Sequence, residues 1–162
     1  MVKKSESSTP VKSSKALNVY NRKAGFDVAV NQTYEAGIAL TGDEIKSIRN
    51  NHVQLTGAYV KLHRSRSQGR LPEVILVGMH LSKAKDPDRI RKLLLHQKEI
   101  EEIDRLLHTK GLAVVPLSLF MQRGWAKIKV GIGPGRRQYD KRQLLKERDL
   151  DRQQRGELKR VK

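Results

Sequence analysis

Residues 112–132 have the sequence LAVVPLSLFMQRGWAKIKVGI, in which two apolar runs flank the turn sequence MQRG. In the second run, Trp and Lys side chains at positions 125, 127 and 129 alternate with apolar ones, which is the period of a half-exposed strand. These runs therefore predict an antiparallel hairpin. Pro116 lacks a backbone N–H, so it predicts an edge position or a bulge in the first strand.

Further strands are predicted upstream of this hairpin, at residues 26–30, 33–40, 57–63 and 73–81. Two helices are predicted as well. The first begins at the capping-box sequence Thr41-Gly-Asp-Glu44, and the second covers about His96 to Thr109, with glutamates in its early turns. The number, length and spacing of the strands predict a mainly β fold: a small closed antiparallel barrel with two or three flanking helices.

Composition divides the chain into three segments. Residues 1–16 are mostly Ser, Lys, Thr and Pro, so they bury too little to offset the entropy of ordering and are predicted to be disordered. Residues 17–134 carry the apolar pattern of a single domain. Residues 135–162 form a basic tail with few apolar side chains, predicted to be disordered when free and helical on a partner.

The net charge of the chain narrows the class of partner to expect. The 162 residues include 34 Lys and Arg against 17 Asp and Glu, a formal net charge of +17, of which the tail contributes +6. Nucleic acid is the commonest polyanionic partner of such a chain. Several basic clusters on a small barrel, with Tyr139 able to stack on a base, favour structured or single-stranded RNA over duplex DNA.

The sequence lacks the signatures of several other functions. It has no cysteine, which excludes disulfides, a thiol nucleophile and Cys-ligated metals, and it has no apolar run long enough to span a membrane. It also contains no phosphate-binding loop and no closely spaced histidine pair. The spacing of Gly131, Gly133 and Gly135 predicts a hinge. We therefore expect no enzyme activity, metal or cofactor.

Six segments resemble the SmpB family, the SsrA-binding proteins that partner transfer-messenger RNA in bacterial trans-translation. They are NRKAGFDV (21–28), TYEAGIALTGDEIKSIR (33–49), DPDRIRKLLLHQKEI (86–100), KGLAVVPLSLF (110–120), WAKIKVGIGPGRRQYDKR (125–142) and LLKERD (144–149). The resemblance implies a closed barrel of oligonucleotide-binding (OB) character with a basic C-terminal tail. It also implies a non-catalytic RNA-binding protein of the bacterial cytoplasm.

The resemblance and the charge pattern together give two sets of candidate residues. The body set, expected to hold the tRNA-like domain of transfer-messenger RNA, is Asn21, Arg22, Lys23, Glu35, Gly37, Lys46, Arg49, Arg89, Arg91, Lys92, Lys127 and Lys129. The tail set, expected to bind the ribosome, is Gly135, Arg136, Arg137, Tyr139, Asp140, Lys141 and Arg142. The resemblance implies that the tail enters the vacant mRNA channel at the small-subunit decoding region.

Through the RNA, the resemblance further implies a functional association with elongation factor Tu and alanyl-tRNA synthetase. We expect a monomer. Two alternatives remain at this point. A structural ribosomal protein would share the size, the charge and the basic tails, and an RNA-modifying enzyme could have a site whose residues are scattered along the sequence.

Overall fold

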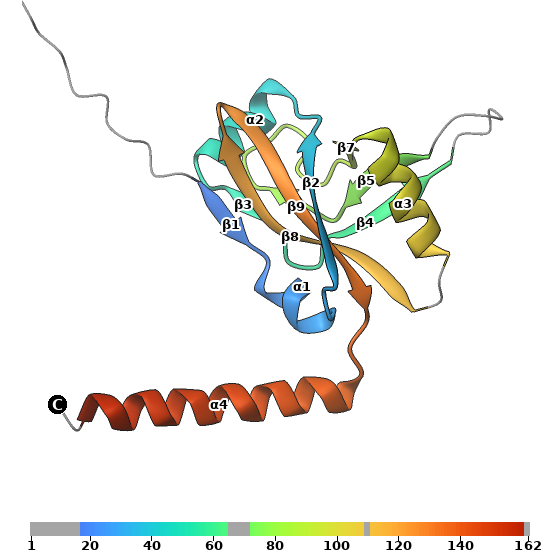
Figure 1. Cartoon of the computed structure of the whole chain (residues 1–162). Coiled ribbons are helices and arrows are strands. Elements are labelled where there is room, and N and C mark those ends of the chain that lie inside the picture. Colours follow the sequence, from blue (N-terminus) through green and yellow to red (C-terminus); the bar gives the residue numbers. More distant parts are fainter. Residues whose placement is uncertain (1–16, 65–71, 109–110, 161–162) are drawn as a thin grey trace, which may run out of the picture.

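The computed structural model of the chain describes residues 17–64, 72–108 and 111–160 (Figure 1). The segment 1–16, expected to be disordered, lies outside the described residues. The helices are α1 (Arg22–Asp27), α2 (Gly42–Arg49), α3 (Gln97–Leu107) and α4 (Gln138–Arg160). The strands are β1 (Asn18–Tyr20), β2 (Gln32–Ile38), β3 (Val53–Gln54), β4 (Tyr59–His63), β5 (Glu73–Val77), β6 (His80–Leu81), β7 (Arg91–Leu94), β8 (Leu112–Gln122) and β9 (Trp125–Pro134).

The hairpin predicted from residues 112–132 is confirmed as β8 and β9. Its turn consists of Arg123 and Gly124, both with positive φ (49° and 83°), and two-residue turns of this kind match the twist of paired strands. The pairing register shifts between Pro116 and Ser118. The bulge predicted at Pro116 is therefore confirmed, and it lies in an inner strand of the sheet.

The prediction of a mainly β, antiparallel fold is confirmed, but the prediction of a closed barrel is wrong. Within the described ranges, seven strands form one sheet in the order β1-β8-β9-β2-β7-β5-β4, and β3 pairs separately with β6. The sheet curls, so that β4 packs against β8 (Figure 1). A closed barrel would require hydrogen-bonded pairing between the end strands β1 and β4, and the described residues form no such pairing.

The hydrophobic core lies inside this curled sheet. Strand residues such as Leu76, Leu93 and Ile128 are at most 2% exposed, and they alternate with exposed or half-exposed neighbours. Ile48 of α2 and Ile103 of α3 are fully buried in the same core. The two predicted helices are therefore confirmed as amphipathic elements that pack on the sheet.

Some local structure differs from the prediction. Residues 22–27 form α1, where a strand was predicted from residue 26, because the side chain of Asn21 accepts a hydrogen bond from the Ala24 amide (3.2 Å) and caps a helix there. The strand predicted over residues 73–81 is divided into β5 and β6. Gly78, with φ at 78°, lies between the two.

The hinge predicted at the glycines 131–135 is wrong for the first two of them. Gly131 and Gly133 lie within β9 and are buried. A β-carbon on Gly133 would lie 1.8 Å from the carbonyl oxygen of Ala29. These glycines therefore allow the segment before β2 to cross closely over β9, which is a packing role.

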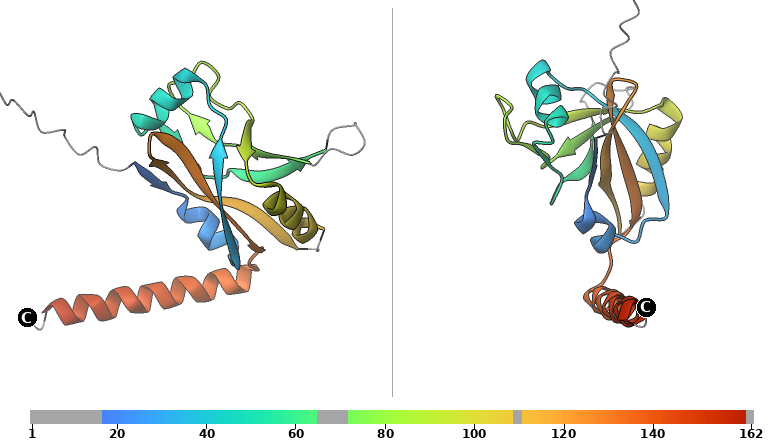
Figure 2. Two further views of the ribbon diagram at one scale, coloured as in Figure 1. Left: turned by 45° about the horizontal axis from the view of Figure 1, so that its top comes forward. Right: turned by 90° about the vertical axis from the view of Figure 1, so that its left-hand side faces the viewer.

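Residues Gln138–Arg160 form α4, which leaves the body after β9 and runs beneath α1 (Figures 1 and 2). Most of the α4 side chains that the structure describes are exposed: Leu145 is 50% and Leu150 is 59% exposed. The helical conformation predicted for the partner-bound tail is the one present in this structure. That the free tail is disordered stays a prediction.

Candidate nucleic-acid interface

One face of the sheet points away from the core and carries the lysines of β9. Lys129 pairs in register with Glu35 of β2, and Lys127 pairs with Gly37, while the residues between them on both strands are buried. Side chains alternate across a sheet, so these residues share its outer face. The structure therefore brings together four of the predicted body residues: Lys127, Lys129, Glu35 and Gly37. We call the surface that they form with the neighbouring residues of β7, β8 and β1 the outer face.

The outer face continues onto β7, the other neighbour of β2. Leu94 lies opposite Gly37 and is 54% exposed, and a β-carbon on Gly37 would lie 3.4 Å from that of Leu94. The absence of a side chain at Gly37 leaves the surface between Lys127 and Leu94 open. Lys92, also on this face of β7, donates to Glu73 at 2.5 Å and is half exposed.

Aromatic side chains on the outer face were not predicted as site residues. Trp125 is 75% exposed at the start of β9, Tyr20 of β1 is 67% exposed, and Phe120 of β8 pairs in register with Lys127. Unpaired bases stack on aromatic rings placed beside cations. The alternation of side chains in β9 was enough to predict Trp125 beside Lys127 on one face. Tyr20 could not be predicted in this way, because it lies on β1, a strand that was not predicted.

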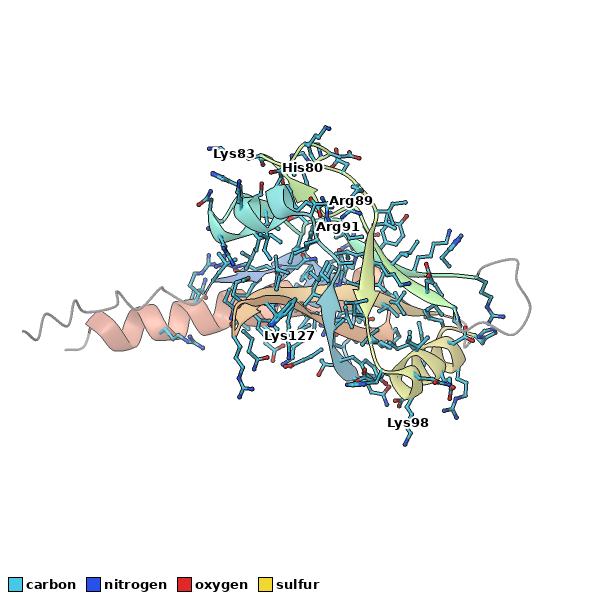
Figure 3. All side chains as sticks on the ribbon, turned by 90° about the horizontal axis from the view of Figure 1, so that it is seen from above. His80, Lys83, Arg89, Arg91, Lys98 and Lys127 are labelled. Atoms are coloured by element: carbon cyan, nitrogen blue, oxygen red, sulfur yellow. The ribbon has the colours of Figure 1, made fainter. Side chains whose placement is uncertain are left out.

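The basic block before α3 divides between the core and the surface. Arg91 is fully buried, and its guanidinium donates to the carbonyls of Met79, Arg89 and Pro87 at 2.6, 2.8 and 3.0 Å. Its Nε donates to Glu44 at 3.0 Å. Arg91 therefore cannot contact RNA in this structure, which corrects the prediction. Figure 3 labels Arg91 next to Arg89.

Glu44 holds the second arginine of this block at the surface. Arg89, 38% exposed, donates to Glu44 from Nε (3.1 Å) and Nη2 (2.7 Å). Burial alone raises the pKa of Glu44, but hydrogen bonds from Arg89 and the Thr41 amide, with the charges of Arg91 and Arg89, lower it to about 2. Arg89 thus presents an oriented cation and remains a candidate for RNA contact.

Asn21 also has a structural role. It is 6% exposed, and its Nδ2 donates to the carbonyls of Leu55 (2.8 Å) and Pro116 (3.0 Å). These bonds fix the start of α1 to the bulge of β8. Since its side-chain donors are directed inward, Asn21 positions the cations that follow it and does not itself reach RNA in this structure, a further correction to the predicted set.

The other candidate cations of the body form separate patches. Arg22 and Lys23 are exposed on the first turn of α1, and Lys46 and Arg49 are exposed on α2. The two helices lie at opposite ends of the sheet (Figure 1). The predicted body residues therefore lie in several places: on the outer face, in the patches on α1 and α2, and, for Arg89, near α2. Asn21 and Arg91 are directed into the interior.

The predicted tail set lies at the junction between β9 and α4. Arg137, Tyr139 and Arg142 are exposed, and Asp140 accepts a hydrogen bond from the Arg137 amide at 3.2 Å, which satisfies an amide at the start of the helix. Gly135 is also exposed, while Arg136 and Lys141 are partly covered by the body. The junction thus presents several cations and one exposed aromatic ring.

Among the described residues, no group of three or more His, Asp or Glu side chains is placed to hold a metal ion. No helix in that part of the chain combines the length and apolarity needed to cross a lipid bilayer.

Comparison with known proteins places the chain in a family. The family model described as "SmpB: SmpB protein" matches residues 18–160. The chain belongs to the SmpB family. It is similar to the SsrA-binding protein of Lactiplantibacillus plantarum, 44% identical over 82% of this chain and 85% of that protein. It is also 40% identical to that of Latilactobacillus sakei, over 85% of this chain and 88% of the relative.

The fold of this SmpB-family chain also resembles a solved structure described as "tmRNA-SmpB: a journey to the center of the bacterial ribosome". The likeness has a TM-score of 0.60 and 34% sequence identity, and it covers 80% of this chain and 95% of that chain. The SmpB family model spans β1 through α4, so both the sheet and the tail helix belong to the family pattern.

Proposed function

We propose that this chain binds the tRNA-like domain of transfer-messenger RNA and helps deliver it to stalled ribosomes in trans-translation. The observation that carries the proposal is the outer face, which combines Lys127 and Lys129 with the exposed ring of Trp125 in a chain of the SmpB family. Lysines bind phosphates and aromatic rings stack on unpaired bases, so this combination suits a folded RNA with exposed loops.

The ionisation of Glu44 fits a structural role for this carboxylate. Glu44, the most perturbed carboxylate near the candidate cations, is held ionised by two arginines and makes structural bonds. An acid or base catalyst needs a pKa near the working pH, and a pKa of about 2 is far below it. Glu44 is therefore unsuited to acid or base catalysis, and the proposed activity is recognition of RNA.

The tail is proposed to bind the ribosome while the body holds the RNA. The segment from Gly135 carries a net charge of +6, and Leu145, Leu150 and Arg142 of α4 are exposed. A basic helix of this kind suits a groove lined with RNA phosphates, and we place it in the vacant mRNA channel near the decoding region. Elongation factor Tu and alanyl-tRNA synthetase would associate through the RNA, in the cytoplasm, with the chain as a monomer.

A gel-shift titration at physiological salt tests the proposed RNA partner. Transfer-messenger RNA, an ordinary tRNA and a DNA duplex of similar charge are each titrated with the full chain. Tighter binding of transfer-messenger RNA than of either competitor is the expected result, because base and shape contacts add to the charge attraction. Equal affinities for the three would reduce the interaction to that of a generic basic protein.

A further inference from the structure

A hollow of about 500 Å³ lies between the start of α2 and the loop that leads into β7, a volume within the range of roughly 300–1,000 Å³ for small-molecule sites. Its lining residues are Thr41, Asp43, Glu44, Lys85, Asp86 and Arg89. Glu44 and Arg89, which form an ion pair across it, are 45 positions apart in the sequence. The hollow is therefore built by the fold and is not a local feature of one loop.

The charges at the hollow balance one another. The cations are Lys85, Arg89 and the buried Arg91 that pairs with Glu44, and the carboxylates are those of Asp43, Glu44 and Asp86. A phosphate group would meet carboxylates as well as cations, so charge attraction gives it no advantage there. A neutral ligand that carries both hydrogen-bond acceptors and donors fits better, and a nucleobase is such a ligand.

Arg89 supplies an oriented donor. Its Nε and Nη2 donate to Glu44 at 3.1 and 2.7 Å, and Nη2 also lies 3.4 Å from the carbonyl oxygen of Ala39. Its Nη1 donates to no residue in the part of the chain that the structure describes. Figure 3 shows this side chain beside Arg91. Because Arg89 lines the hollow and is 38% exposed, Nη1 is available to a ligand there.

Asp86 supplies an acceptor near this donor. Hydrogen bonding to Glu44 raises the pKa of Arg89, and the charge of Asp86 also raises it, so Asp86 lies within reach of the guanidinium. Asp86 is exposed, and its carboxylate accepts no hydrogen bond from the described residues. The other exposed carboxylate, Asp43, belongs to the first turn of α2, where it complements the helix dipole. Asp86 is therefore the acceptor that the fold leaves free.

Guanine matches this donor and acceptor better than the other bases do. One of its edges presents the acceptors O6 and N7, and the neighbouring edge presents the donors N1–H and N2–H. The two oxygens of a carboxylate can accept from both of these donors at once. Adenine and cytosine offer a single amino group, and uracil offers a single N–H. A carboxylate beside an arginine donor thus favours guanine.

The hollow lies at the rim of the outer face. Ala39, whose carbonyl faces Arg89, follows Gly37 by two residues, and its amide donates to the carbonyl of Lys92 at 2.9 Å. Gly37 and Lys92 both belong to the outer face. An RNA strand bound to the outer face therefore passes close to the hollow, and an unpaired nucleotide at that edge can turn its base into it.

We propose that this hollow binds an unpaired guanine base of the RNA, with Nη1 of Arg89 donating to O6 or N7 and the carboxylate of Asp86 accepting from N1–H and N2–H. The proposal deepens the proposed function and rests on it, since RNA is the ligand. The lysines of the outer face supply affinity that does not depend on sequence, and the hollow adds a preference for one base.

Three fluorescently labelled RNA pentamers, AAGAA, AAAAA and AACAA, test the preference. They carry the same charge and differ only in the central base, so the lysines attract them equally. Fluorescence anisotropy at low salt measures their binding to the full chain. AAGAA should bind at least about fivefold more tightly than the other two, the low end of the discrimination that one bidentate base contact gives. Equal affinities, or no binding of any pentamer, would overturn the guanine site.

Two variants connect the preference to the hollow. Arg89→Lys keeps the charge but removes the guanidinium, and Asp86→Ala removes the acceptor. Each should reduce the preference for AAGAA over AAAAA to less than about twofold, because the remaining contact is no longer specific for guanine. The matched controls are Arg49→Lys on α2 and Asp88→Ala, both exposed or partly exposed side chains outside the hollow, and they should keep the preference. A preference that survives Asp86→Ala, or is lost in the controls, would overturn the site.

The design separates a failure of the guanine site from a failure of the proposed function. Asp86 makes no hydrogen bond to the described residues, so Asp86→Ala tests the site even where loss of the Glu44–Arg89 bonds unfolds Arg89→Lys. The gel-shift titration with transfer-messenger RNA measures the proposed function independently of the base in the hollow. Equal pentamer affinities in a chain that binds transfer-messenger RNA tightly would refute the guanine site alone.

Discussion

Glu44 and Arg91, 47 residues apart in the sequence, form an ion pair inside the body: Nε of Arg91 lies 3.0 Å from Oε1 of Glu44, and the two side chains are 0% and 3% exposed. The same carboxylate caps α2 by accepting from the Thr41 amide at 2.8 Å and binds Arg89 at the surface. One buried group therefore connects the start of α2, the start of β7 and a candidate RNA-binding cation.

The first prediction concerns the stability that this pair contributes. Glu44→Gln keeps the shape of the side chain but leaves the Arg91 guanidinium buried without its counter-charge. We expect a loss of about 3–5 kcal/mol in the free energy of unfolding, measured by urea denaturation. Asp43→Asn, an exposed neighbour in the same helical turn, should cost less than about 1 kcal/mol. Equal losses of unfolding free energy for the two variants would show that the buried pair contributes no more to stability than the exposed carboxylate of Asp43 does.

The second prediction concerns the pH dependence of stability. In the folded chain the pKa of Glu44 is lowered from 4.5 to about 2, so the folded state binds this proton less tightly than the unfolded state does. The contribution of Glu44 is therefore fully present above about pH 4.5 and is lost as the pH falls towards 2. The difference in unfolding free energy between the wild type and Glu44→Gln should shrink over this range. A difference that stays constant would contradict the lowered pKa.

The third prediction concerns the close crossing over β9. Gly133→Ala places a methyl group where the Ala29 carbonyl lies, so the backbone of one segment must move. We expect a loss of about 2–4 kcal/mol in unfolding free energy. Gly135→Ala is the matched control, because a β-carbon there meets nothing within 4 Å, and it should change stability by less than about 0.5 kcal/mol. A tolerated Gly133→Ala would contradict the packing role of this glycine.

The sequence predicted those elements whose cause is local. The alternation in residues 125–130 predicted β9, Pro116 predicted the bulge, and the Thr41–Glu44 capping box predicted the start of α2. Each of these signals lies within a few residues of the element that it determines.

Features that depend on contacts between residues far apart in the sequence were not predicted. β7 begins at Arg91, a residue type that argues against a buried strand until Glu44 is known to lie beside it. The sheet is open because its end strands β1 and β4 are not paired within the described residues, and no local sequence pattern indicates whether two distant strands pair. For the same reason, the sequence assigned Arg91 to RNA contact and could not place Tyr20 on the outer face.

The fourth prediction separates the tail from the body. Truncation after Arg137 keeps the backbone bonds of the tail root and removes α4. It should leave affinity for transfer-messenger RNA within about threefold, because the outer face is intact, while tagging of proteins on stalled ribosomes in a reconstituted translation system should be lost. Retained tagging would refute this division of labour.

The fifth prediction concerns the conformation of the tail. We expect α4 to lose much of its helicity when isolated from the body, because a single helix with few apolar contacts is marginal in water. A peptide of residues 138–160 should therefore show little helix by circular dichroism in buffer, and should gain helix on addition of ribosomal RNA. A peptide that is fully helical in buffer would contradict the predicted disorder of the free tail.

Salt-dependent binding of transfer-messenger RNA tests the role of the outer face most directly. The measurement compares the double variant Lys127→Ala/Lys129→Ala with Lys83→Ala/Lys98→Ala, which removes the same charge from exposed positions off β9; Figure 3 shows Lys83 on the side of the molecule away from Lys127. The β9 variant should bind more weakly and lower the slope of log affinity against log salt by about 1 per lost phosphate contact, while the control stays near the wild type. Equal affinities and slopes for the two variants would contradict the assignment of RNA binding to the outer face.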